Sequence, residues 1–171
     1  MKSIEWQNEE CKNVEALDTY HFVVEGREEG TMDFATFKIK YAETMLYYQM
    51  IEHDIKYIYA FMCEGNVAEH YESIENKTLG QMITMLKDLD NSDNDPLISN
   101  DDYNFLKQIC DNRNHWAHSV FPVFIYEDGF LGSTEYQKQC RKLDKDHDRV
   151  QRASQLLETF RLEFCKARND V

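Results

Sequence analysis

From Thr31 to Glu64 apolar residues recur at steps of three and four, and neither proline nor glycine interrupts them. This spacing draws one apolar stripe along a single long helix, which Gly65 ends. The whole chain has only 2 prolines and 6 glycines in 171 residues, so composition also favours helix over sheet. We therefore expect an all-α protein. The stripe comprises Phe34, Phe37, Tyr41, Met45, Tyr48, Ile51, Ile55, Ile58 and Met62.

The rest of the chain predicts a single helical domain over residues 1–171, with a less regular segment at 1–30. We expect an up-and-down bundle of about four main helices. After His118, β-prone residues flank an Asp-Gly pair, which predicts a short irregular or β-hairpin insertion before the last helix. The further helices are expected at Asn8 to Asp18, Asn66 to Ile74, after an N-cap at Thr78, from Ser99 or Asn100 to His118, and from Thr134 to Ala167.

Charge is distributed unevenly along the chain. The formal net charge is −13, which disfavours nonspecific binding of nucleic acid over the whole surface. The segment from Lys138 to Asn169 is the exception, with nine Lys and Arg against five Asp and Glu. Five of these cations share one face of the last helix, as either an RNA-binding stripe or a plain solvated face. They are Lys138, Lys142, Lys145, Arg149 and Arg152.

Several classes of protein lack their usual signatures here. The first residues, MKSIEWQNEECK, contain no apolar signal segment, and no apolar run is long enough for a membrane span. We expect a cytoplasmic protein with no membrane partner, whose 5 scattered cysteines are free thiols. Phosphate-binding, dinucleotide-binding and esterase glycine motifs are absent, and no histidine has a glutamate three residues before it, as a di-iron bundle requires.

The residues DNRNHWAH, ending at His118, concentrate side chains that suit phosphate chemistry. On a straight helix Arg113 and His118 diverge by about 140°, while Asn114 and His118 lie on one face. A long arginine arm could span that angle if the helix ends there. Arginine offers a rigid fork of donors for phosphate, and histidine both accepts and donates protons near neutral pH. Together these residues predict a phosphodiester site.

Two other interpretations of these residues stay open. Arginine and histidine near a helix C-terminus also stabilise the helix dipole, with Trp116 serving only as core. Cys110, His115 and His118 could instead approach one metal ion, although a structural zinc site usually has four ligands and no fourth is evident.

The segment RNHWAH resembles the Arg-x-x-x-x-His motif of the HEPN superfamily (higher eukaryotes and prokaryotes nucleotide-binding). It has the frequent form with asparagine directly after the arginine and a small residue before the histidine. Its expected position, at the end of a late helix followed by one more long helix, is also similar to that family. The motif covers six residues, and the helical architecture agrees over most of the chain.

This resemblance implies a metal-independent endoribonuclease that acts as a homodimer on an RNA substrate, without a cofactor. His118 would assist attack of the ribose 2′-OH on the adjacent phosphate, which leaves a 2′,3′-cyclic phosphate. Arg113 would stabilise charge on the phosphoryl oxygens, and Asn114 would orient the phosphate or the histidine. His115 is either an auxiliary group or a mere neighbour. The family also suggests a toxin or phage-defence role, with an antitoxin or regulatory protein as partner.

Two features depart from the family pattern. Antitoxin-paired members often carry a tyrosine two residues after the histidine, where this chain has Val120, so regulation by modification of that tyrosine is not expected. The acidic balance suits an RNA-cleaving enzyme only if the basic stripe lines the cleft or the substrate is one folded RNA. A catalytically inactive HEPN-like dimeric bundle, serving as an interaction or nucleotide-binding module, is therefore the alternative.

Two further patterns concern packing. The long first helix has more tyrosines than one face can hide, which indicates either a dimer surface or ordinary packing. His147 falls on the apolar stripe of the last helix, where we expect a hydrogen-bonded core or interface histidine. The tyrosines are Tyr41, Tyr47, Tyr48, Tyr57 and Tyr59.

Overall fold

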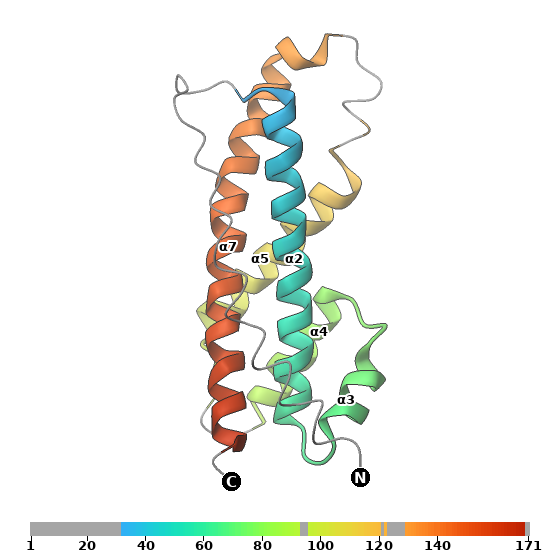
Figure 1. Ribbon diagram of the computed structural model, residues 1–171, viewed down its shortest axis with the longest axis vertical. Coiled ribbons are helices and arrows are strands. Elements are labelled where there is room, and N and C mark those ends of the chain that lie inside the picture. The colour runs from blue at the N-terminus through green and yellow to red at the C-terminus, as the bar shows by residue number, and fades with distance from the viewer. Residues whose placement is uncertain (1–31, 93–95, 121, 123–128, 170–171) are drawn as a thin grey trace.

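The structure, a computed structural model, describes residues 32–92, 96–120, 122 and 129–169. Most of these residues are helical and none forms a strand, which confirms the all-α prediction. The predicted helix at 8–18 and most of the predicted hairpin, at 121 and 123–128, lie outside this described part. The helices are α2 (Phe34–Met62), α3 (Val67–Ile74), α4 (Leu79–Asp90), α5 (Asn100–His118) and α7 (Thr134–Asn169), with a 3₁₀ helix, η2, at Phe130–Gly132 (Figure 1).

The beginnings of the helices follow from capping chemistry. Thr78 accepts a hydrogen bond from the backbone of Gln81, whose side chain in turn accepts one from the backbone of Thr78, so α4 starts with a complete capping box. Ser99 caps α5 by accepting from the backbone N–H of Asp102 at 3.1 Å. Both caps stand where the sequence predicts them, because Ser and Thr satisfy amide groups that the first turn leaves unpaired.

The directions of the helices follow from the contacts between them. Contacts between α2 and α7 advance together along both chains, from Lys40 with Asp144 to Asp54 with Arg161, so these two helices are parallel (Figure 1). Strict alternation of four helices would make the first and last antiparallel. Here the short helix α3 and its connections return the chain before α4 begins, and α5 runs against α2, α4 and α7.

One hydrophobic core joins all the long helices. Its largest fully buried side chains come from every one of them: Phe37, Tyr48, Ile51, Ile55 and Ile58 of α2, Met82 and Leu86 of α4, Leu106, Ile109 and Trp116 of α5, and Leu143 and Leu157 of α7. The predicted apolar stripe of α2 is thus confirmed as the side that faces the other helices. Among the described residues, no helix is both long and apolar enough to cross a membrane.

A buried carboxylate joins α4 to the start of α5. Asp90 is 3% exposed and accepts hydrogen bonds from the backbone N–H groups of Leu97 at 2.9 Å and Ile98 at 3.1 Å. It also accepts one from the Tyr103 hydroxyl at 3.0 Å. Burial and then the bond to Asp90 raise the pKa of Tyr103, so the phenol keeps its proton and remains a donor. The aspartate therefore fixes the path of the chain into α5.

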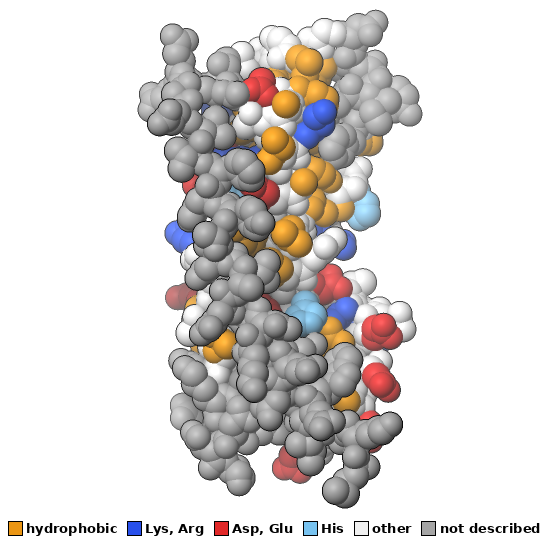
Figure 2. All heavy atoms as spheres, viewed as in Figure 1, with side chains coloured by type: hydrophobic (Ala, Val, Ile, Leu, Met, Phe, Trp, Pro, Cys, Tyr) orange, Lys and Arg blue, Asp and Glu red, His pale blue; other side chains and the backbone are white. Residues whose placement is uncertain are grey.

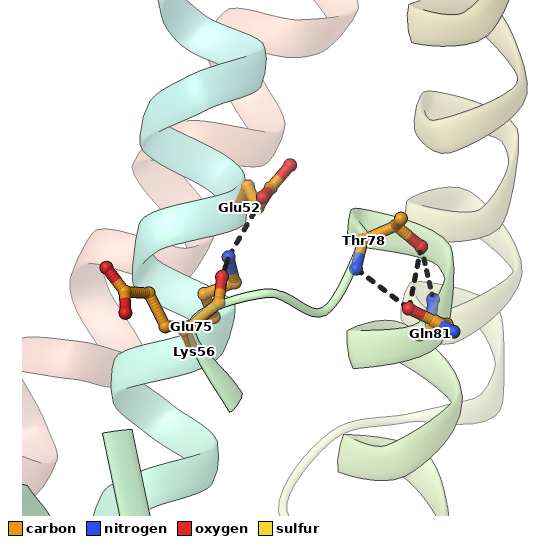
Figure 3. A network of polar contacts seen from close by, with 5 residues as sticks. All are labelled: Glu52, Lys56, Glu75, Thr78 and Gln81. Carbon is orange, nitrogen blue, oxygen red and sulfur yellow. Dashed lines mark hydrogen bonds and ion pairs between the residues drawn. The ribbon is translucent and has the colours of Figure 1, made fainter. Parts of the chain in front are cut away.

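A buried lysine ties α3 to α2. Lys56 is only 8% exposed, and its ammonium donates to Glu52 Oε1 at 3.0 Å and to the carbonyl oxygen of Glu75 at 2.8 Å (Figure 3). Figure 3 shows this pair beside the turn that leads to the Thr78 capping box. Since Glu75 follows directly after α3, the lysine holds the end of α3 against the outer side of α2.

We expect Lys56→Met to lower the free energy of unfolding by about 2 kcal/mol, because the apolar stem stays buried while two acceptors lose their charged donor. Urea denaturation measures this as a lower midpoint with an unchanged slope. Lys77→Met is the matched control, since Lys77 is exposed, and it should change stability by less than about 0.5 kcal/mol. Equal effects of the two substitutions would contradict the assigned role of Lys56.

Candidate functional site

The RNHWAH residues occupy the last two turns of α5, and His118 is the final residue of that helix. Two contacts hold these turns in place. The hydroxyl of Tyr41 on α2 donates to the backbone oxygen of Trp116 at 3.1 Å, and the Trp116 ring is fully buried against Phe37 and Tyr41. The end of α5 is therefore anchored to the first half of α2, while the side chains on its other face remain free to meet a ligand.

The predicted catalytic residues differ in exposure. His118 and Asn114 are exposed, whereas Arg113 is half-buried. The Arg113 guanidinium donates to Asn114 Oδ1 at 3.4 Å, and its charge acts against the rise that burial causes in the pKa of the Cys110 thiol. Arg113 thus lies on the Cys110 side of the helix, and no contact with His118 is recorded among the described residues.

His115 has a mixed environment. Its ring is half-buried and meets the Trp116 ring edge-on, with centroids 5.2 Å apart. Its Nε2 is buried and has no hydrogen-bond partner within the described parts of the chain. The position fits a neighbour of the site that packs on the anchor residue, and its role as an auxiliary group stays a prediction.

A closed polar network underlies the RNHWAH turns. Asp146 of α7 is 3% exposed and accepts hydrogen bonds from the indole N–H of Trp116 at 2.9 Å and from Asn112 Nδ2 at 3.0 Å. Lys142 donates to the same carboxylate at 2.5 Å and to Asn112 Oδ1 at 3.3 Å, and its ammonium lies 5.5 Å from the Trp116 ring centroid. Because Asn112 and Trp116 are one turn apart on α5, this network fixes the rotation of the helix that carries Arg113.

Sequence reasoning missed this network. From the sequence, Asp146 is assigned to no site, although an acidic residue four positions after a lysine has a usual spacing for a helical ion pair. Asn112 and Trp116 share the same spacing and could have indicated a polar partner for the indole N–H, which is usually hydrogen-bonded when buried. The pairing across two helices depends on how α5 and α7 pack, and no pattern within one helix contains that information.

The basic stripe of α7 divides in the structure. Lys142 belongs to the buried network, and Arg149 bonds Gln108 of α5 while its guanidinium lies over the Phe105 ring. Lys138 pairs with Glu135 on its own helix, which leaves Lys145 and Arg152 as exposed cations without a recorded partner in the described region. Two of the five cations, Lys142 and Arg149, therefore join α7 to α5, the helix that ends in the RNHWAH turns.

The prediction for His147 is confirmed. Its Nδ1 lies 3.1 Å from the hydroxyl of Thr44, a fully buried residue of α2 that itself donates to the Lys40 carbonyl at 2.7 Å. The hydroxyl proton is thus used, so Nδ1–H is the donor to the threonine oxygen. Burial, followed by the charge of Lys40, lowers the pKa of His147, which favours a neutral ring in the interface of α2 and α7.

The tyrosines of α2 are divided between core and surface. Tyr48 is buried and Tyr41 anchors Trp116, whereas Tyr47 packs edge-on against His147. Tyr57 lies with His53 and Tyr71 in an aromatic group on the outer side of α2. Ordinary packing accounts for most of these rings.

No three His, Cys, Asp or Glu side chains in the described region come together in a way that could hold a metal ion. Known proteins give no further guide to the site. No family model matches the chain, and no curated protein and no solved structure matches it either.

Proposed function

We propose that the chain is a metal-independent endoribonuclease of HEPN type that acts as a homodimer. The observation that carries this proposal is the placement of RNHWAH: an exposed His118 ends α5, held by the buried Trp116 two residues earlier, with one more long helix following. The proposal includes four main helices, α2, α4, α5 and α7, with an irregular or hairpin insertion before α7, and a role as a toxin or phage-defence effector.

The proposed chemistry needs no cofactor. His118 accepts the proton of the ribose 2′-OH as that oxygen attacks the adjacent phosphate, and the leaving 5′-oxygen receives a proton as its bond to phosphorus breaks. The products are a 2′,3′-cyclic phosphate and a free 5′-hydroxyl. Arg113 stabilises the negative charge that develops on the phosphoryl oxygens, with Asn114 as a neighbouring amide donor. Lys145 and Arg152 are the exposed cations of the stripe that remain for the RNA backbone.

The separation of Arg113 from His118 within one chain supports a site made by two chains. In a homodimer the guanidinium of one protomer can face the imidazole of the other across a two-fold axis. The same separation is the specific reason for a second candidate function, a catalytically inactive dimeric module in which the RNHWAH residues serve only packing and the helix terminus.

Cleavage of total RNA in the presence of EDTA tests the proposal. Wild-type protein should produce fragments that end in a 2′,3′-cyclic phosphate, and His118→Ala and Arg113→Ala should not. Cleavage that is equal in all three preparations would identify a contaminating nuclease. Absence of cleavage over varied RNAs, by a protein shown to be a folded dimer, would favour the inactive module.

A further inference from the structure

The outer side of α2 carries a second row of exposed residues, apolar from Ala35 to Leu46 and polar at its end, opposite the side that faces the core. We name it the outer seam, and all its members are exposed, with Ile39 at 60% and Leu46 at 55%. Figure 2 shows hydrophobic side chains gathered in a column over α2 on this face. The members follow one another at steps of four and three, the heptad spacing by which helices pair. The outer seam is Ala35, Ile39, Ala42, Leu46, Gln49 and His53.

The outer seam ends where α3 begins to cover α2. Lys56 bonds the carbonyl after α3, Ala60 is fully buried, and the Tyr71 ring lies 6.0 Å from that of His53 at the edge of the seam. A helix that binds the seam therefore cannot cover the C-terminal third of α2, because α3 already packs there. Two copies of α2 paired in parallel would bring their α3 helices to the same place, whereas an antiparallel pair places each α3 beyond the start of the other α2.

We propose that the outer seam is the surface through which two copies of this chain pair, with their α2 helices antiparallel and the two-fold axis passing near Thr44. In this register Leu46 packs on Ala42 of the other copy, which alternates large and small side chains as close helix packing requires. The seam from Ala35 to His53 is about 27 Å long, enough for five turns of each helix.

Charge on the two flanks of the seam fits a second copy of the chain. Lys38, which is exposed and lies 5.0 Å from the Phe34 ring centroid, falls opposite Glu52 of the other copy, and symmetry makes this contact twice. Glu52 is half-buried and its Oε1 also accepts from Lys56 of its own chain at 3.0 Å, so Lys38 would add a second cation to this carboxylate. On the other flank, Glu43 of one copy lies close to Glu43 of the other near the two-fold axis, and these two negative charges repel each other. The register thus predicts that removing the charge of Lys38 weakens dimerisation and that removing the charge of Glu43 strengthens it.

The catalytic role of this pairing rests on the proposed function. Tyr41 holds Trp116 on the Lys38 side of α2, and α5 runs antiparallel to α2. One turn back along α5, Arg113 therefore lies at about the level of Thr44, where the two-fold axis passes. A two-fold axis perpendicular to paired antiparallel helices keeps both copies of this flank on one face of the dimer, so both RNHWAH turns lie on the same face.

Sedimentation velocity of the full chain from 1 to 100 µM tests the pairing independently of RNA cleavage. We expect a dimer for wild type and at least a 10-fold higher dissociation constant for Leu46→Asp, with an unchanged circular dichroism spectrum. Leu97→Asp is the matched control, because Leu97 is 57% exposed away from the seam, and it should remain dimeric. Glu43→Gln should strengthen dimerisation, and Lys38→Glu should weaken it.

A wild-type monomer at 100 µM, or an unchanged dimer in Leu46→Asp, would overturn the proposed surface. Weaker association of Glu43→Gln would overturn the antiparallel register. These results differ from failure of the proposed function, which would be a dimer that depends on Leu46 and yet cleaves no RNA.

Discussion

His118→Ala is expected to lower the rate of RNA cleavage by at least about 100-fold, because a positioned acid or base contributes that much or more. Arg113→Ala should lower it by a similar factor, as the loss of one preorganised donor to a developing oxyanion does. Arg113→Lys should remain strongly impaired, since an ammonium keeps the charge and loses the fork that fits two phosphoryl oxygens. Initial rates on a labelled RNA, with EDTA present, measure all three.

His70→Ala is the control for these substitutions. His70 lies on α3, bonds the Glu64 carbonyl at 2.8 Å, and belongs to neither the seam nor the RNHWAH turns. It should cleave RNA at the wild-type rate. A loss in His70→Ala as large as that in His118→Ala would show that removing any histidine disturbs the protein, and the assignment of His118 as the catalytic base would fail.

Asp146→Ala should cause the largest loss of stability among single substitutions of polar residues, about 3 kcal/mol. The change leaves the buried indole N–H of Trp116 without an acceptor and also removes the partner of Asn112. Lys142 is about one-third exposed and can turn to solvent, so the ion pair itself contributes only part of the loss. Asp146→Asn keeps one acceptor and should lose about half as much.

Thermal and urea unfolding of these variants provide the comparison. Asp148→Ala is the control, because Asp148 is an exposed residue of the same helix, and its stability should stay within about 0.5 kcal/mol of wild type. Should Asp146→Ala unfold at the wild-type midpoint, the network could not be what fixes α5 against α7.

The helix caps and the apolar stripe of α2 could be predicted from the sequence, because each depends only on residues that are close together in the chain. Thr78 and Ser99 start helices by bonding amides within three residues, and the apolar stripe of α2 follows from the helical period alone. The direction in which α2 and α7 pair was not readable. Periodicity tells which side of a helix is buried, and it does not tell which helix covers that side or which way it runs.

The candidate site shows the same division. The sequence identified Arg113 and His118 by their chemistry and gave their angular separation on a helix, and the structure places both residues in α5, with Arg113 half-buried and His118 exposed. The sequence did not indicate that Lys142 turns toward Asp146. A residue near the edge of a helical stripe can face either solvent or a neighbouring helix, and the sequence does not tell which. The excess of tyrosines on α2 suggested a dimer surface, but none of those tyrosines belongs to the outer seam, which the exposure of Ile39 and Leu46 places on the surface.

Mixing Arg113→Ala protein with His118→Ala protein tests most directly whether the two catalytic groups come from different chains. Each variant alone should be inactive. After subunit exchange, half of the dimers combine both variants, and each of these has one complete site, so about a quarter of the wild-type activity should return. If mixed dimers are demonstrated by native mass spectrometry and the activity does not return, the shared site between two protomers is contradicted.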